Sequence, residues 1–477
     1  MLNQHLSALL ANIVAYDGAD PMISGLCIDS RMAKPHELFL ASRGTQQDGR
    51  MFIENAIQNG VAGVIYEAEN LTPQIQDIIE KYKSQLPMIA IQHLDEKVGL
   101  IAQRFYQNPA QHMHLVGVTG TNGKTSCAYF LTEALELLGK KAAMMGTIGI
   151  GATSALKESS HTTLTALPLQ QQLYELNQQQ FKYINMEVSS HALDQHRVAH
   201  LPFEVALFTN LTLDHLDYHK TMQAYGEAKA KLFKWPSLKY AVVNLDDAFS
   251  NTIIDHISDK VKIIGVTLNG KTHARCDLLI QAQNIQLSAD ETTALVIASA
   301  RNLGEFKTPI LGHFNLSNLL LVLGALLALE VPFNDALQVL QKIHEPPGRL
   351  TKIGGHHQAH VFIDYAHTPD ALEKVLTVLK PLCQGQLWCV FGCGGDRDKS
   401  KRPIMARIAE QYANKVIVTD DNPRTENSEQ IIADILQGLT QPKQAIIEHD
   451  RTKAIQYAIK HAAANDFVLI AGKGHED

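Results

Sequence analysis

The sequence predicts an α/β protein with three domains, covering residues 1–112, 113–345 and 346–477. Three observations support this. From His114 onward, short apolar runs alternate with helical patterns, as is typical of a mostly parallel sheet covered by helices. The length of 477 residues exceeds one ordinary hydrophobic core. The segment Pro346-Pro-Gly348 cannot continue a helix and marks a domain boundary.

The first domain is predicted to be a small α/β unit. Strands are expected at Val61–Tyr66 and Pro87–Ile91, where β-branched and apolar residues are concentrated. A helix is expected to precede them, because apolar residues recur with helical spacing at Leu2, Leu6, Leu9, Leu10 and Ile13.

The central domain is predicted to contain a mostly parallel sheet flanked by helices. Residues 277–300 alternate polar and apolar side chains, which indicates a small antiparallel extension, and a long helix is expected at 316–329. The predicted parallel strands are Leu115–Val118, Tyr183–Val188, Val205–Thr209, Tyr240–Asn244 and Val261–Val266.

The C-terminal domain repeats the alternation of strands and helices, which predicts a Rossmann-like α/β unit. Its expected strands are Val361–Asp364, Leu387–Phe391, Val416–Thr419 and Phe467–Ala471.

Composition excludes several classes of function. Apolar residues make up 45% and charged residues 19% of the chain, as in soluble globular proteins. The net charge of −7 argues against general nucleic-acid binding. No apolar run is long enough to span a membrane, no basic leader or apolar signal core is visible, and six scattered cysteines suit a reducing cytoplasm. A cytoplasmic protein is therefore expected.

The strongest motif runs from the apolar strand at Leu115–Val118 into Thr119-Gly-Thr-Asn-Gly-Lys-Thr125 and then into a helical pattern. Glycines allow backbone N–H groups to surround phosphates, the helix start favours negative charge, and Lys124 adds a positive charge. Thr125 could hold the magnesium that accompanies the nucleotide. The spacing departs from the strict phosphate-loop pattern, because the first glycine lies one residue early and position 118 is Val. ATP binding is predicted.

Polar clusters follow several predicted strands, where ligands collect in open α/β sheets. Glu187, Asp214 and His215 are candidates to hold magnesium or to orient its waters, with the carboxylates favoured over the histidine. His215 and His219 could suggest zinc, but no His-Glu-x-x-His pattern accompanies them. Taken alone, each of these residues is better interpreted as a helix cap or a satisfied polar core group.

Three further clusters lie in the C-terminal domain: Gly394-Gly-Asp-Arg397, Asp421-Asn-Pro-Arg424 and Gly472-Lys-Gly-His-Glu476. Converging arginines and carboxylates suit a zwitterionic small molecule, because each group complements one charge of an amino acid. ATP in one domain and an amino acid in another indicate activation of a carboxylate by phosphoryl transfer, followed by attack of an amine.

The chain resembles the Mur ligases of peptidoglycan synthesis over essentially its whole length. The resemblance rests on the phosphate loop, on the three C-terminal clusters, and on Glu187-Val-Ser-Ser-His191, Asp214-His-Leu-Asp-Tyr-His219 and Asp364-Tyr-Ala-His-Thr-Pro369. It implies an ATP-dependent, Mg²⁺-dependent and monomeric ligase that joins meso-diaminopimelate to UDP-MurNAc-L-Ala-D-Glu through an acyl phosphate. Alternatives are a lysine-adding sister ligase, a ligase like folylpolyglutamate synthetase, or a non-catalytic nucleotide-binding module.

The resemblance also implies roles for individual residues around the nucleotide. The implied catalytic residues are Lys124, Lys229, His215 and Glu187. The implied metal ligands are Thr125, Glu187, His215 and Lys229, the last as a carbamate. The implied nucleotide contacts are Gly120, Thr121, Asn122, Gly123, Lys124, Thr125, Ser126, Asn318, Arg349 and Asp364.

For the other substrates, the resemblance implies three groups of contacts. Arg424 is the expected discriminator, because its guanidinium can bind a second carboxylate that lysine lacks. His161 departs from the family, whose members have asparagine there. The family continues beyond the position of Asp477, so weak support is expected for the last strand. The groups are Ile28, Ser30, Thr45, Gln46 and Gln47 for UDP; Thr162, Thr163, Ser189, Gln195 and Arg197 for the muramoyl dipeptide; and Arg397, Asp421, Asn422, Pro423, Arg424, Gly472 and Glu476 for diaminopimelate.

Overall fold

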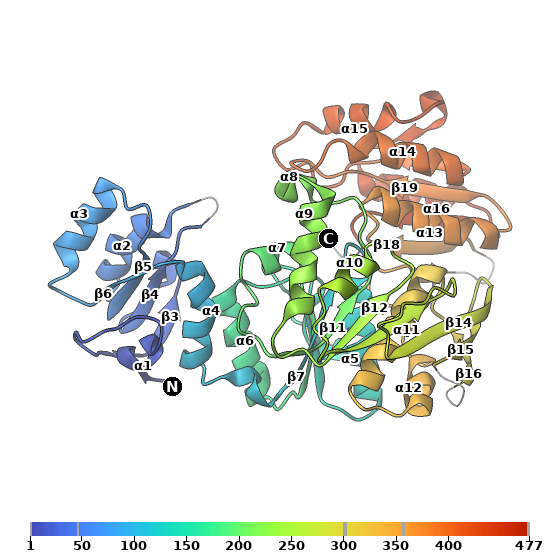
Figure 1. Cartoon of the computed structure of the whole chain (residues 1–477). Coiled ribbons are helices and arrows are strands. Elements are labelled where there is room, and N and C mark those ends of the chain that lie inside the picture. Colours follow the sequence, from blue (N-terminus) through green and yellow to red (C-terminus); the bar gives the residue numbers. More distant parts are fainter. Residues whose placement is uncertain (1, 45–46, 299–302, 355–357, 475–477) are drawn as a thin grey trace. The chain divides into compact units, whose positions relative to one another are not determined.

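The computed structural model describes residues 2–44, 47–298, 303–354 and 358–474 (Figure 1). The chain packs into two compact units. The first comprises Met1–Leu115, Ser159–Ile184 and Val188–Phe203, and the second comprises Val116–Glu158, Asn185–Glu187 and Glu204–Asp477.

The first unit is built on a parallel sheet with the strand order β3-β4-β5-β6. Successive side chains of a strand point to opposite faces, so both faces need cover. Leu38 and Leu40 of β4 pack with one group of helices, and Phe39 with another. The strands are β3 (Gly25–Cys27), β4 (Glu37–Ala41), β5 (Gly63–Glu67) and β6 (Met88–Ile91). Two short strands that precede them in the sequence, β1 (Gln4–His5) and β2 (Met22–Ile23), form a separate antiparallel pair.

Helices α1 and α4 contribute to the core on the Leu38 face, and α2 and α3 to the core on the Phe39 face. Helix α6 packs against α4. The helices of this unit are α1 (Leu6–Leu10), α2 (Ile53–Gln58), α3 (Pro73–Tyr82), α4 (Leu94–Phe105), α6 (Ala166–Gln178) and α7 (Ser190–Asp194), with the 3-10 turns η1 (Ser30–Met32), η2 (Gly49–Phe52) and η3 (Pro109–His112).

The central sheet has the order β16-β15-β14-β13-β12-β11-β7-β10-β8-β9 among the described residues. Strands β11 to β14 pair in parallel, whereas β14, β15 and β16 pair antiparallel. The strands are β7 (His114–Thr119), β8 (Ala142–Gly146), β9 (Gly149–Gly151), β10 (Tyr183–Glu187), β11 (Phe203–Phe208), β12 (Tyr240–Asn244), β13 (Lys262–Thr267), β14 (Leu278–Leu287), β15 (Thr292–Ile297) and β16 (Leu303–Thr308).

Helix α11 is the most apolar helix near this sheet, and it packs against both α5 and β12. It is buried almost all round, as expected of a helix inside a large core. The other helical elements are α5 (Lys124–Leu137), α8 (Leu216–His219), α9 (Met222–Ala230), α10 (Ser250–Asp255), α11 (His313–Ala328), α12 (Phe333–Leu340), η4 (Thr153–Ala155) and η5 (Lys231–Lys234).

The C-terminal sheet has the order β17-β18-β22-β19-β20-β21, and only the pairing of β17 with β18 is antiparallel among the described residues. Helices α13, α14 and α15 contribute to the core on one face, and α16 to the core on the other. The elements are β17 (Thr351–Gly354), β18 (His360–Asp364), α13 (Pro369–Leu382), β19 (Leu387–Phe391), α14 (Lys401–Tyr412), β20 (Lys415–Val418), α15 (Ser428–Leu436), η6 (Pro442–Gln444), β21 (Ile446–Ile447), α16 (Arg451–His461) and β22 (Phe467–Ala471).

The predicted mixed α/β fold is confirmed, including the antiparallel extension at β14–β16. Two details were wrong. The first helix is shorter than its apolar pattern, and Asn12 just after it has a left-handed φ of 57°. The last strand is well supported, because β22 lies between β18 and β19 and is buried throughout.

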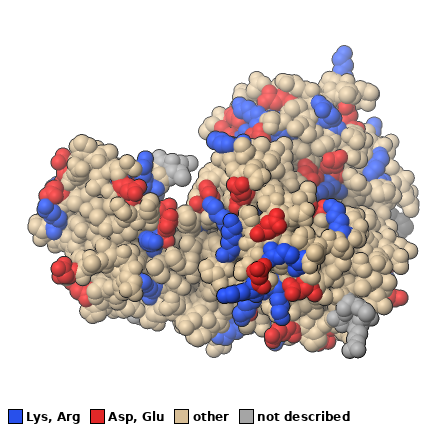
Figure 2. Space-filling view, viewed as in Figure 1, with Lys and Arg blue, Asp and Glu red and all other residues tan. Residues whose placement is uncertain are grey.

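The surface carries both signs of charge. Basic and acidic side chains are interspersed over the visible face (Figure 2). Among the described residues, no helix combines the length and the apolar character needed to cross a membrane.

Candidate nucleotide and amino-acid sites

The phosphate loop connects the end of β7 to the start of α5 at Lys124. Two glycines make its shape possible. Gly120 has φ +147° and a Cβ there would collide with Thr209 Oγ1; Gly123 has φ +88°, and a Cβ there would lie 2.6 Å from Asn318 Oδ1. Because the backbone N–H groups at a helix start have no partner within the helix, this loop can bind a phosphate.

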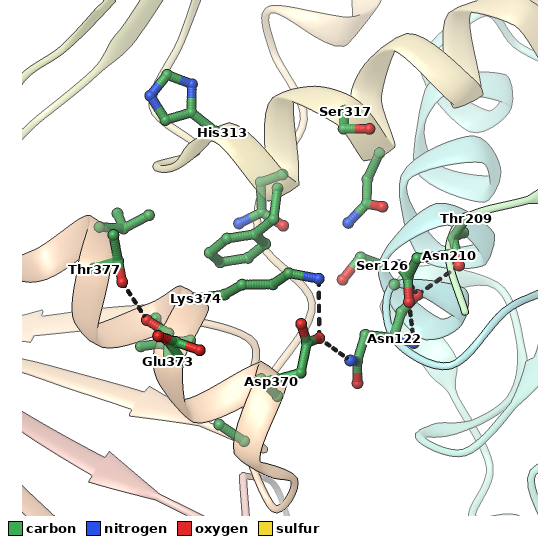
Figure 3. Close-up of a pocket in the computed structure, with 18 of the residues that line it drawn as sticks. Asn122, Ser126, Thr209, Asn210, His313, Ser317, Asp370, Glu373, Lys374 and Thr377 are labelled. Atoms are coloured by element: carbon green, nitrogen blue, oxygen red, sulfur yellow. Dashed lines mark hydrogen bonds and ion pairs between the residues drawn. The ribbon is translucent and has the colours of Figure 1, made fainter. Parts of the chain in front are cut away.

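The strand end of β11 holds this loop in place. The Thr121 N–H donates to Asn210 O (2.8 Å) and the Asn122 N–H to Asn210 Oδ1 (3.0 Å). The Thr209 hydroxyl donates to Asn122 O at 2.6 Å, and Figure 3 shows these side chains converging. The polar run after β11 was noted in the sequence, but this supporting role of Thr209 and Asn210 was not predicted.

Two lysines meet at the loop, Lys229 fully buried and Lys124 half-buried. Lys124 Nζ donates to Gly120 O (3.0 Å) and Thr121 O (2.8 Å), and Lys229 Nζ donates to Gly120 O at 2.7 Å. Burial lowers the pKa of Lys124, although Glu187 opposes this. Burial and the neighbouring Lys124 lower the pKa of Lys229 well below its usual value. An uncharged Lys229 amine is therefore favoured far more than in water.

Glu187, at the end of β10, is buried beside the start of α5. Its Oε2 accepts the Thr125 hydroxyl at 2.9 Å, and its Oε1 accepts the Thr147 N–H at 2.7 Å. A hydroxyl and a carboxylate at this spacing are hard oxygen donors of the kind that magnesium prefers. The donor chemistry therefore fits the predicted metal role of Thr125 and Glu187.

His215 precedes α8 and adopts a left-handed φ of 54°. Its Nε2 lies 3.5 Å from Asp214 Oδ2. Burial pushes the pKa of Asp214 upward, but His215, His367 and Lys401 outweigh burial and lower it. Within the described chain, no three His, Cys, Asp or Glu side chains gather around one point. Magnesium that accompanies a nucleotide needs fewer protein ligands, because phosphates and waters complete its coordination.

A cavity of about 630 Å³ adjoins the loop, and it lies within the second unit. The predicted residues that line it are Asn122, Gly123, Ser126, Asn318, Arg349 and Asp364. Arg349 Nη2 donates to the Thr125 hydroxyl at 3.0 Å, which connects the segment after Pro346-Pro347 to the phosphate loop.

Asp364 is the buried carboxylate of this cavity. It accepts the N–H groups of Leu350 (2.7 Å) and Ala366 (2.8 Å). Burial raises its pKa to about 6, although Arg349 and the two N–H groups oppose the shift. Such a group can accept hydroxyl donors when ionised, which suits its predicted contact with the nucleotide.

Asp370 and Lys374 also line this cavity, although the sequence motifs did not predict them. Asp370 Oδ2 accepts the Asn122 side-chain amide at 2.7 Å and Lys374 Nζ at 2.9 Å (Figure 3). A sequence signal for Asp370 did exist, because Thr368-Pro369-Asp370 is a capped helix start that follows the strand β18.

In the first unit, the residues expected to contact the dipeptide come together. The Thr163 hydroxyl accepts the Ser189 N–H at 3.1 Å, and Arg197 Nη1 donates to Thr163 O at 3.0 Å. Arg197 Nη2 donates to Gln195 Oε1 at 2.6 Å. Thr162 lies next in sequence, half-buried.

The residues expected to contact UDP are also in the first unit. Ser30 is buried at the start of η1, and its carbonyl accepts the Asn59 side-chain amide at 2.8 Å. Ile28 is 40% exposed and Gln47 is exposed. Thr45 and Gln46 lie outside the described residues.

The arginine-bearing loops follow β19 and β20, which are parallel neighbours. Arg397 and Arg424 are exposed, and Arg424 Nη1 donates to Gly395 O at 2.8 Å. Asn422 and Pro423 are half-buried in the second loop. A Cβ on Gly472, after β22, would lie 3.0 Å from Asp421 Oδ2, so a third predicted segment reaches this site.

The last predicted contact of that site, Glu476, lies outside the described residues.

Three family models match the chain. They are the Mur ligase middle domain over residues 118–326, the Mur ligase glutamate ligase domain over 348–474, and the Mur ligase family catalytic domain over 22–106.

Relatives match over nearly the full length. A ligase of Coxiella burnetii (strain RSA 493 / Nine Mile phase I), named UDP-N-acetylmuramoyl-L-alanyl-D-glutamate--2,6-diaminopimelate ligase, is 45% identical over 476 residues, covering 100% of this chain and 96% of the relative. A Pseudomonas aeruginosa protein of the same name is 45% identical over 458 residues, covering 96% and 91%.

A solved structure of a protein with that name has a TM-score of 0.71 at 35% identity, covering 99% of this chain and 94% of the other. The MurF structure from Acinetobacter baumannii has a TM-score of 0.67 at 17% identity, covering 99% and 96%, and shares the fold. Fold and site together define a phosphate-loop α/β protein of the ligase class. The chain belongs to the Mur ligase family.

Proposed function

We propose that this protein is an ATP-dependent ligase that adds meso-diaminopimelate to UDP-MurNAc-L-Ala-D-Glu. The observation that carries the proposal is its 45% identity, over its full length, to ligases named for that reaction. The second unit supports it, because it contains both the phosphate loop and the loops that bear Arg397 and Arg424. A solved structure of MurF from Thermotoga maritima is named as a complex with ADP, which supports an adenine nucleotide as the energy source.

The proposed reaction has two steps. The γ-phosphoryl group of ATP passes to the D-glutamyl carboxylate, giving ADP and an acyl phosphate. The diaminopimelate amine then attacks the acyl carbon, the C–O bond to phosphate breaks, and phosphate and a proton leave. Lys124 stabilises the charge on the transferring group. Asp364, Asn318 and Arg349 position the nucleotide at the cavity.

Thr125 and Glu187 would hold magnesium, which supplies charge neutralisation for phosphoryl transfer when bound. Lys229 is proposed to carry a carbamate: its neutral amine nitrogen bonds to the carbon of CO₂ and releases a proton. The lowered pKa of Lys229 supports this, because only the neutral amine reacts. The product is an anion suited to a second magnesium, whereas an ammonium would repel it. His215 is proposed to help place metal from beside Asp214.

The cluster of Thr163, Ser189, Gln195 and Arg197 is proposed to bind the dipeptide, and the region of Ser30 to bind UDP. The bonds from Arg197 to Thr163 and Gln195 support a preorganised polar site. The cytoplasmic location, the monomeric state and the boundaries of three domains stay predictions from the sequence.

An omission series tests the proposal. Phosphate release and ligated product, the latter by mass spectrometry, are measured with ATP, magnesium and both substrates, then with each substrate left out. Product that requires every component is expected. ATP binding without amino-acid-dependent product would instead support the non-catalytic nucleotide-binding alternative.

A further inference from the structure

The two loops that bear the exposed arginines of the amino-acid site are joined to each other. They follow β19 and β20 at the same edge of the sheet, where Phe391 pairs with Val418. The Gly395 N–H donates to Asn422 O at 2.9 Å, and Arg424 Nη1 donates to Gly395 O at 2.8 Å. Neither loop is therefore positioned alone.

Both loops contain a residue in the left-handed conformation. Asp396 and Arg424 each have φ +53°, which aspartate tolerates but arginine rarely adopts. Such a conformation persists only where surrounding contacts determine it. The Asp396 carboxylate accepts the Thr425 hydroxyl at 2.7 Å and the Thr425 N–H at 3.1 Å, and Arg424 binds Gly395 O, so each of these two residues is held through the other loop.

Beneath the loops lies Arg402 of α14, whose side chain is fully buried. Its Nη2 lies 3.0 Å from Glu426 Oε1 and donates to Gly394 O at 3.3 Å, and its Nη1 lies 2.8 Å from Asp434 Oδ2. A buried guanidinium whose two terminal nitrogens each bind a carboxylate is a rigid anchor, because the planar fork is fixed at both ends by charge-assisted bonds.

Glu426 connects this anchor to the first loop. Its Oε1 also accepts the Asp396 N–H at 2.6 Å, and its Oε2 lies 3.1 Å from Lys399 Nζ. The bond from Arg402, and then those from Asp396 and Lys399, hold the pKa of Glu426 at about 2. The carboxylate is therefore ionised at any pH at which the enzyme is assayed.

We infer that Glu426 is a positioning residue: it fixes the spacing of Arg397 and Arg424 and so sets the selectivity for an amino acid with a second carboxylate. This inference rests on the proposed function. Two arginines grip two carboxylates only at a matched separation, and a shift of about 1 Å is enough to lose much of the benefit. The Arg402–Glu426 pair supplies that separation from below the site.

Asp434 offers a matched control. It binds the same guanidinium as Glu426, and its other hydrogen bond comes from Gln430 in its own helix, α15. The substitutions Glu426→Gln and Asp434→Asn each remove one carboxylate from Arg402. Only the first also weakens the link to Asp396.

The experiment measures KM for meso-diaminopimelate, ATP and UDP-MurNAc-L-Ala-D-Glu, with thermal melting, in the wild type and both variants. For Glu426→Gln, we expect KM for meso-diaminopimelate to rise about tenfold or more, with the other two KM values within about twofold. For Asp434→Asn, we expect a similar loss of thermal stability but less than about a twofold change in that KM.

Equal effects of the two variants on KM for meso-diaminopimelate would overturn the inference, as would an equal rise of all three KM values. If Glu426→Gln does not fold, Thr425→Val tests the same link from the exposed side, and an unchanged KM there overturns the inference. Wild-type turnover that does not depend on meso-diaminopimelate would overturn the proposed function itself, which separates the two failures.

Discussion

The phosphate loop and the arginine-bearing loops differ in how far their charged side chains are exposed to water. Lys229 and Glu187 are 1% exposed, and burial shifts the pKa values of Lys124 and Lys229. Arg397 and Arg424 are exposed, and the buried charge that supports Arg424's loop, Arg402, lies beneath it. At the phosphate loop, the side chains proposed to act in catalysis are themselves removed from water. At the arginine-bearing loops, only the supporting Arg402 is removed from water.

This difference predicts different kinetic consequences. Desolvated charges act strongly on a transition state, so their loss should lower kcat. Exposed arginines bind a substrate in competition with water, so their loss should raise KM for that substrate and relax selectivity. The following substitutions test that contrast, from the largest effect to the smallest.

Lys124→Ala should reduce phosphate release by about 10³-fold or more, because it removes the charge beside the transferring phosphoryl group. Phosphate release at saturating substrates measures this, with circular dichroism as the check on folding. A folded Lys124→Ala variant that forms ADP at a near-normal rate would contradict the role.

Lys229→Ala should lower kcat by about 10²-fold while nucleotide affinity changes little, because the anion proposed at this position acts on the metal-bound phosphates. Carbon-13 NMR with labelled bicarbonate should show a carbamate signal in the wild type that Lys229→Ala lacks. A fully active variant, or a signal that survives the substitution, would refute the carbamate.

Arg424→Lys should raise KM for meso-diaminopimelate by about 10- to 100-fold, with a smaller change in kcat, because lysine cannot form the paired bonds of a guanidinium. The substitution also removes the bond from the Arg424 guanidinium to Gly395 O. The ratio of kcat/KM for meso-diaminopimelate to that for L-lysine is the readout. An unchanged ratio would remove Arg424 as the discriminator.

Asp364 gives a pH dependence. Its pKa of about 6 means that the free protein holds this carboxylate ionised above pH 6 and protonated below. ATP affinity should therefore fall by up to about tenfold from pH 7.5 to pH 5, since one pH unit below the pKa leaves about a tenth ionised. Isothermal titration of the wild type and Asp364→Asn measures it. The same slope in both proteins would assign the effect to ATP instead.

The most successful predictions from the sequence concern features whose residues lie close together along the chain. The phosphate loop is contiguous, and strand, glycines and helix start sit within a few residues, so its structure followed from pattern alone. The alternation in 277–300 likewise predicted antiparallel pairing. The length predicted for the first helix was wrong, because apolar spacing does not reveal that the chain turns into a left-handed conformation at Asn12.

Long-range pairs could not be predicted. Asn122 and Asp370 are separated by 248 positions, and Arg402 and Glu426 by 24. Nothing in local periodicity links such partners, because their proximity is set by strand order in the sheet. Arg402 lies in a charged segment close to Arg397 in the sequence, but only the structure shows that its side chain is buried beneath the loops.

The most direct test compares phosphate release by the wild-type protein with meso-diaminopimelate and with L-lysine, at saturating ATP, magnesium and UDP-MurNAc-L-Ala-D-Glu. The account predicts release with meso-diaminopimelate and little with L-lysine. Release with L-lysine instead would keep the ligase chemistry and contradict the selectivity assigned to the arginine-bearing loops. No release with either amino acid would contradict the proposed reaction.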